Sequence, residues 1–186
     1  MESKEGQQYL DITQAWVEKF VVGLNLCPFA PPVVDGKRLR YTYSAAENID
    51  VLYQNLLQEM EFLALADPDE WETTLLVHPH VLQDFYLYND FLEIVDEALE
   101  AADLAGALQV ASFHPQYLFA GEDPEASSHY TNRSPYPMLH LLREDSLENA
   151  LKSYPKPEEI PQNNIVTMQN LGLKKIRKML SELGVD

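Results

Sequence analysis

The chain has 186 residues, with 13 Lys and Arg against 30 Asp and Glu, which gives a net charge of −17. This excess of acids argues against a sequence-independent nucleic-acid binder, which needs cations to contact phosphates, and against an anionic membrane surface as partner. Hydrophobic residues make up 46% of the chain, and the length predicts one domain over residues 1–186. No apolar run approaches the length of a membrane span.

The N-terminus lacks the basic stretch and apolar core of a signal peptide. The single cysteine cannot form an internal disulfide, which favours a reducing cytoplasm as the location. No Lys or Arg occurs from Tyr41 to Asn132, a stretch of 92 residues that holds 18 Asp and Glu. The oligomeric state stays open.

Apolar spacing and the positions of proline predict the elements in chain order. The first helix is expected to stop before Pro28, because the residue before a proline disfavours helical geometry. The first half of the chain is predicted as a helix over 8–25, a loop over 28–36, a strand over 39–43, a helix over 47–65 and a strand over 73–78.

The second half continues the alternation and then becomes helical. Residues 81–102 carry the clearest apolar stripe of the chain, with acids on the other side. The predicted elements are a helix over 81–102, a strand over 107–113, a loop of about 20 residues, a strand over 138–143, a helix over 145–154 and a C-terminal helical pair broken near Gly172.

This alternation of strands and helices favours crossover connections. We therefore expect an α/β fold with about four strands in a mixed, mainly parallel sheet covered by helices. Strands 73–78 and 107–113 are nearly continuous in apolar character, which predicts central strands buried on both faces. Strand 138–143 follows a loop, so it can run antiparallel. A ferredoxin-like α+β arrangement is the alternative.

Both predicted central strands end in His-Pro, at His78-Pro79 and His114-Pro115. If the strands are parallel neighbours, both imidazoles emerge at the carboxyl edge of the sheet, where open α/β folds bind ligands. A histidine there can give or take a proton at neutral pH. Each histidine can instead cap its strand by bonding a backbone carbonyl.

The long loop after His114 contains further candidate binding residues. Arg133 is the first cation after the acidic stretch, and its guanidinium could hold a carboxylate or phosphate through paired hydrogen bonds. A structural ion pair is the alternative. Polar side chains from the same segments would orient the ligand, namely Tyr117, Asn132, Ser134 and His140.

Cys27 and the histidines allow two other kinds of site. At the end of the first predicted helix, the negative end of the helix dipole would raise the thiol pKa of Cys27, which favours a structural thiol over a nucleophile partnered by His114. A zinc ion could be held by His78, His114 and His140, but no short metal-binding spacing is present. No cofactor is favoured.

Four sequence blocks resemble a family of bacterial proteins of about this length, catalogued as a domain of unknown function. They are LNLCPFA at 24–30, the LVHP strand end, SFHPQYLFAG at 112–121 and YTNRSPYPMLHLLRE at 130–144. The resemblance covers nearly the whole chain and implies no activity, fold or catalytic residue. Relatives carry Asn where this chain has His80, which leaves His80 outside the expected site.

The leading hypothesis is therefore an enzyme, with hydrolysis as the expected reaction, acting on a small polar or anionic molecule. His114 would act as acid or base, with His78 and Cys27 as further catalytic candidates, and Arg133 would hold the anion. Two alternatives remain: a non-catalytic module that binds a protein through its acidic face, and a metal-dependent enzyme that uses the histidines.

Overall fold

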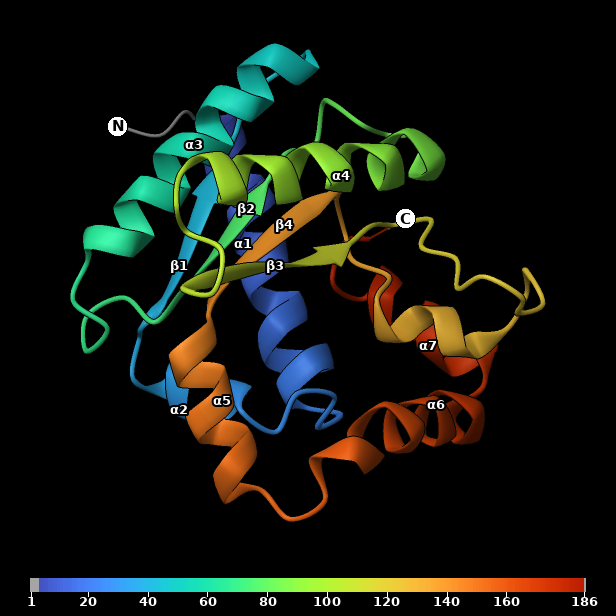
Figure 1. Cartoon of the computed structure of the whole chain (residues 1–186). Helices are drawn as coiled ribbons and strands as arrows, with labels where there is room; N and C mark the ends of the chain where they lie inside the picture. Colours follow the sequence, from blue (N-terminus) through green and yellow to red (C-terminus); the bar gives the residue numbers. More distant parts are fainter. Residues whose placement is uncertain (1–3, 186) are drawn as a thin grey trace.

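The computed structural model describes residues 4–185 and contains one mixed sheet with the strand order β1-β2-β4-β3 (Figure 1). β1 and β2 are parallel, and β4 runs antiparallel to both β2 and β3. The strands are β1 (Leu39–Tyr43), β2 (Thr73–Val77), β3 (Leu108–Phe113) and β4 (Met138–Arg143).

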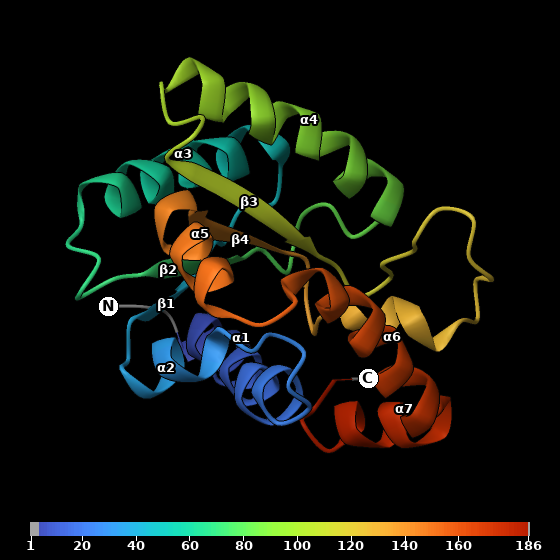
Figure 2. The ribbon, with the colours of Figure 1, turned by 60° about the horizontal axis from the view of Figure 1, so that its bottom comes forward.

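Helices cover both faces of the sheet, as Figures 1 and 2 show from two directions. α3 (Ile49–Leu65) and α4 (Phe85–Ala101) lie on one face. The other helical elements are α1 (Lys4–Trp16), the π-helical η1 (Val17–Val22), α2 (Ala30–Asp35), η2 (Ser127–Thr131), α5 (Glu144–Ser153), η3 (Pro157–Glu159), α6 (Ile160–Leu171) and α7 (Leu173–Ser181).

The strand alternation divides the buried residues into two cores. Leu76, Leu139 and Leu141 face α3 and α4, where the fully buried Tyr88 and Phe91 of α4 pack. Side chains at the intervening strand positions face α1, η1, α6 and α7; they include Leu75, Val77, Met138 and Phe113. The sheet is therefore the middle layer of three.

The α/β class and the mixed four-stranded sheet are confirmed, and helices on both faces exclude the one-sided ferredoxin-like alternative. The expected central position of strand 107–113 is wrong, because β4 lies between β2 and β3 and leaves β3 at an edge, whereas β2 is central. The long segment from His114 to Pro137 lets the chain turn back and insert β4 antiparallel. Only one of the three strand pairings is parallel.

The observed local structure differs most from the prediction in the N-terminal helix. It divides into α1 and η1, and residues 28–36, predicted as a loop, contain the short helix α2. Gly23 directly follows η1, and a Cβ atom added there would lie 2.2 Å from the carbonyl oxygen of Lys19. Only glycine fits this close backbone contact. No helix within residues 4–185 is long and apolar enough to cross a membrane.

Candidate functional site

His78 and His114 follow β2 and β3, and both imidazoles are fully buried on the α4 side of the sheet. The ring of Tyr88 lies near both, with centroid distances of 5.9 Å to His78 and 5.0 Å to His114. β2 and β3 point in the same direction, so the expectation that both rings emerge at one edge agrees with this arrangement even though the strands are not neighbours.

The nitrogens of these two rings mainly contact backbone atoms. His114 Nδ1 accepts from the N–H of Gln116 at 3.0 Å, so Nε2 carries the proton that it donates to the carbonyl of Leu82 at 3.0 Å. His78 Nδ1 bonds the carbonyl of Val81 at 3.1 Å. Burial lowers the pKa of His78 to about 4 and also lowers that of His114. Both rings therefore hold the loop before α4 in place.

The segment around Arg133 is packed against the end of β3. Asn132 Nδ2 donates to the carbonyl of Ser112 at 3.2 Å, and the N–H of Ser134 donates to the carbonyl of His114 at 3.4 Å. Arg133 Nε donates to the carbonyl of Tyr117 at 3.1 Å, and its guanidinium lies 4.8 Å from the ring centroid of Tyr130. These contacts brace the strand end.

The remaining polar groups of this segment have the same local character. Ser134 Oγ donates to the carbonyl of Tyr136 at 2.7 Å, and the hydroxyl of Tyr117 lies 3.4 Å from Ser112 Oγ. Neither the cavity on the α1 side of the sheet nor the depression at the amino ends of α3 and α4 is lined by His114 or Arg133. The hypothesis that these residues act on a polar substrate stays a prediction.

His140 and Cys27 lie on the opposite face from His78 and His114. The side chain of His140 lies on the same face of β4 as those of Met138 and Leu142, toward α1, whereas the ring of His78 packs on α4. The sheet therefore separates the three histidines of the zinc alternative, and residues 4–185 contain no group of three side chains placed to hold a metal ion. It also separates Cys27 from its expected partner His114.

A cavity of about 580 Å³ opens between the sheet and the helices on the α1 side. Its walls come from α1, η1, α2 and α5, and Figure 2 shows α1 and α2 across the sheet from α4. Most of its surface is apolar, with Trp16, Val21, Phe29, Leu75, Phe113 and Leu147 among the lining residues. This size and composition are typical of sites that bind small molecules.

His140, beside Thr73, places a polar group on the sheet side of this cavity. Its Nε2 lies 2.8 Å from Thr73 Oγ1, and its ring lies 6.2 Å from that of Phe113. Burial lowers the pKa of His140 to about 4, so the ring is neutral at pH 7. A neutral imidazole in an apolar pocket can accept or donate one hydrogen bond and can accept a proton from a bound molecule.

Cys27 lines the same cavity at the entrance to α2. Its thiol pKa is raised, as expected, but the cause is different, because Cys27 does not end a helix. Burial raises the pKa, and the N–H groups of Phe29 and Ala30, which hydrogen-bond the sulfur, offset part of the effect. The group is therefore a thiol at neutral pH and a poor nucleophile.

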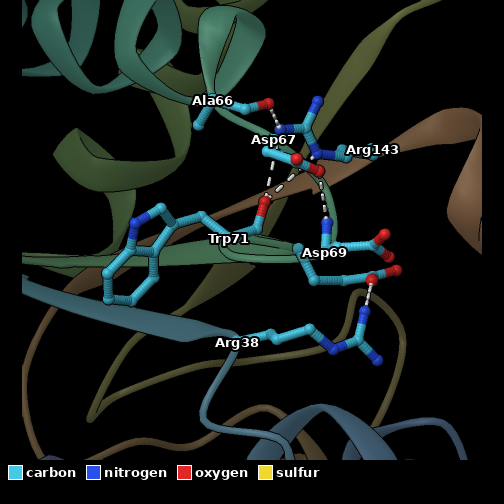
Figure 3. Close-up of polar contacts among 7 residues, drawn as sticks. Arg38, Ala66, Asp67, Asp69, Trp71 and Arg143 are labelled. Carbon is cyan, nitrogen blue, oxygen red and sulfur yellow. Dashed lines mark hydrogen bonds and ion pairs between the residues drawn. The ribbon is translucent and has the colours of Figure 1, made fainter.

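Two arginines mark the end of the cavity near the amino ends of β1 and β2, where Figure 3 shows their contacts. Arg38 forms an ion pair with Glu72. The guanidinium of Arg143 donates to the carbonyls of Ala66, at 2.7 Å, and Trp71, at 3.2 Å, so it ties the end of α3 to the sheet. The cavity thus lies over the face of the sheet opposite to the α4 side, on which His78 and His114 are buried.

A second, more open depression of about 490 Å³ does lie at the carboxyl edge of β1 and β2. The amino ends of α3 and α4 form its sides, and the carbonyls held by His78 and His114 belong to residues in its wall, Val81 and Leu82. Its charged residues are all acids, namely Glu47, Asp50 and Asp84. Such a surface disfavours an anionic ligand.

Comparison with known families gives one match. The family model described as "Protein of unknown function (DUF1415)" matches residues 8–178. The chain belongs to this family. Neither the curated proteins nor the solved structures compared with the chain include a match. The DUF1415 match confirms the family resemblance inferred from the four blocks, and it assigns no chemistry to any residue.

The sequence blocks at 24–30 and 130–144 contribute Cys27, His140 and Arg143 to the cavity wall. Sequence reasoning named Cys27 and His140, but only as parts of other sites, and it missed Thr73 and Trp16. Strand alternation could have placed His140 on the face of Met138 and Leu142. The division of the N-terminal helix, which shapes the cavity wall, left no signal in the periodicity. π-helical segments are often found at functional sites.

Proposed function

We propose that this DUF1415 protein binds a small, mostly apolar molecule in the cavity between α1, α2, α5 and the sheet. The observation that carries the proposal is the cavity of about 580 Å³, whose apolar wall includes one neutral histidine. An apolar pocket with a few converging polar groups is the arrangement that most binding sites share.

The acid or base role first assigned to His114 passes to His140 in this proposal. His140 is half-buried and lines the cavity, whereas both nitrogens of His114 already have backbone partners. His140 would hold the polar group of the bound molecule and, if a reaction follows, would accept its proton. We place the protein in the cytoplasm, where the single Cys27 stays a thiol.

A substitution that fills the cavity tests the proposal. Ala150 of α5 lines the cavity, and Ala150→Trp adds a large side chain to that wall. The fluorescent probe N-phenyl-1-naphthylamine is neutral and apolar. We expect it to bind the native protein and to bind the Ala150→Trp variant at least about tenfold more weakly, because the indole occupies its space. Fluorescence titration measures both affinities.

The matched control is Ala64→Trp, at an exposed position of α3 outside the cavity. It should bind the probe like the native protein. Cys27 provides a second readout, because bound probe should slow its alkylation by N-ethylmaleimide, followed by intact mass. Absence of probe binding to the native protein, or equal binding by the Ala150→Trp variant, would contradict the proposal.

A further inference from the structure

The hydrogen bonds behind His140 determine which group the cavity can recognise. Thr73 Oγ1 lies 2.8 Å from His140 Nε2 and is also hydrogen-bonded to the carbonyl oxygen of Leu141. A carbonyl oxygen only accepts, so the single hydroxyl proton of Thr73 is donated to Leu141. The hydroxyl oxygen then accepts from His140, which places the imidazole proton on Nε2.

The other nitrogen of this ring, Nδ1, is left with a lone pair. Within residues 4–185 it has no hydrogen-bond partner, and it is not one of the buried polar atoms that lack a partner. It is therefore accessible, and the cavity is the open space beside the ring. Leu75 and Ala111 are the strand neighbours of His140, and both line the cavity with apolar side chains.

The two guanidinium groups in the cavity wall have hydrogen-bond partners within the protein, and the charge of the whole chain disfavours an anion. The guanidinium of Arg38 is paired with Glu72, and the guanidinium of Arg143 is held by the carbonyls of Ala66 and Trp71. The net charge of −17 also repels anions at long range. In the apolar part of the wall, the Nδ1 atom of His140 is therefore an accessible hydrogen-bond acceptor, whereas Arg38 and Arg143 lie at one end of the cavity.

We infer that the cavity selects a neutral molecule with an apolar ring body and one O–H or N–H donor, which hydrogen-bonds His140 Nδ1. Thr73 is the positioning residue, because it orients His140 as an acceptor. This inference rests on the proposed function, whose ligand class it specifies. The DUF1415 protein then distinguishes phenol-like or indole-like molecules from ethers of the same shape.

Three naphthalenes with the same ring body test the selection. 2-Naphthol carries a donor, 2-methoxynaphthalene lacks it, and 2-naphthoate carries a negative charge. We expect the native protein to bind 2-naphthol about tenfold more tightly than either of the other two, since a buried acceptor without a partner weakens binding. Displacement of N-phenyl-1-naphthylamine measures all three affinities.

Thr73→Val tests the role of the positioning residue. The variant removes the acceptor for His140 Nε2–H, so the imidazole proton is no longer confined to Nε2 and the preference for 2-naphthol should fall to about twofold or less. Thr74→Val is the matched control: Thr74 is also buried, lies on the other face of β2, and its hydroxyl has no partner among the described residues. That variant should keep the tenfold preference.

The binding experiments test the ligand selection and the proposed function separately. If neither the naphthalenes nor N-phenyl-1-naphthylamine binds the native protein, the proposed function fails. If they bind without preference for 2-naphthol, if 2-naphthoate binds most tightly, or if Thr73→Val keeps the full preference, the cavity is a binding site but the selection by His140 and Thr73 is wrong.

Discussion

Acidification from pH 7 to pH 5 is expected to lower the free energy of unfolding by about 4 kcal/mol, through His78 and His140 alone. Both side chains have a pKa of about 4 in the folded protein against an ordinary 6.5, because burial disfavours the charged ring. Each contributes about 2 kcal/mol at pH 5 on this difference. His114, whose pKa is also lowered by burial, adds to the loss.

The sign follows from which state binds protons more readily. The unfolded chain protonates these histidines as the pH falls through 6.5, whereas the folded protein keeps them neutral until about pH 4. Their stabilising contribution is complete above pH 6.5 and is lost progressively below it. A loss of this size is a large part of the free energy of unfolding of a typical domain, which is about 5–15 kcal/mol.

Urea unfolding at pH 7, 6 and 5 measures the effect. Most carboxylates titrate below this window, so the histidines dominate the slope. In a His78→Gln variant, the slope between pH 6 and pH 5 should be smaller by about 1.2 kcal/mol per pH unit. A free energy of unfolding that stays constant from pH 7 to pH 5 would contradict the burial of neutral imidazoles.

Replacement of Tyr88 by Ala is expected to destabilise the fold by roughly 3–5 kcal/mol, the usual range for removal of a large buried aromatic ring. Tyr88 is fully buried, and its ring packs near His78 and His114. Its hydroxyl donates to the carbonyl of Met138 at 2.8 Å and accepts from the N–H of Phe113 at 3.1 Å. Tyr88 thus links α4 to the ends of β3 and β4.

Two further variants divide this effect into its parts. Tyr88→Phe keeps the ring but leaves a buried carbonyl and a buried N–H without the hydroxyl, which should cost about 1–3 kcal/mol. Tyr86→Ala is the control, because Tyr86 lies on the same helix with 67% of its surface exposed; its change should stay within about 0.5 kcal/mol. Equal losses for Tyr88→Ala and Tyr86→Ala in urea unfolding would refute the packing described here.

The sequence predicted the strands well because their apolar, β-branched runs are bounded by prolines and turns. Residues 39–43 and 138–143 were predicted with the observed bounds, and the break at Gly172 coincides with a φ of +71°. The position of β4 between β2 and β3 was not predictable from local patterns, because it depends on where a long connection returns. The division between α1 and η1 was likewise not predictable from local patterns.

The candidate site was predicted only in part, because its contacts also depend on how distant segments of the chain assemble. The two His-Pro strand ends indicate that His78 and His114 lie at one edge, but the contacts with Val81 and Leu82 depend on a loop whose geometry only the fold defines. His140 was recognised as a candidate, yet the face to which it points depends on how the sheet is assembled. A binding role for His140 follows only after helices from both ends of the chain enclose it.

The most direct test of the binding site is the protonation of His140, measured by nitrogen NMR of the histidine side chains with and without 2-naphthol. We expect His140 to carry its proton on Nε2, and 2-naphthol to shift the Nδ1 resonance of His140 while those of His78 and His114 stay in place. A proton on Nδ1 of His140, or a response to 2-naphthol at His114 instead, would contradict it.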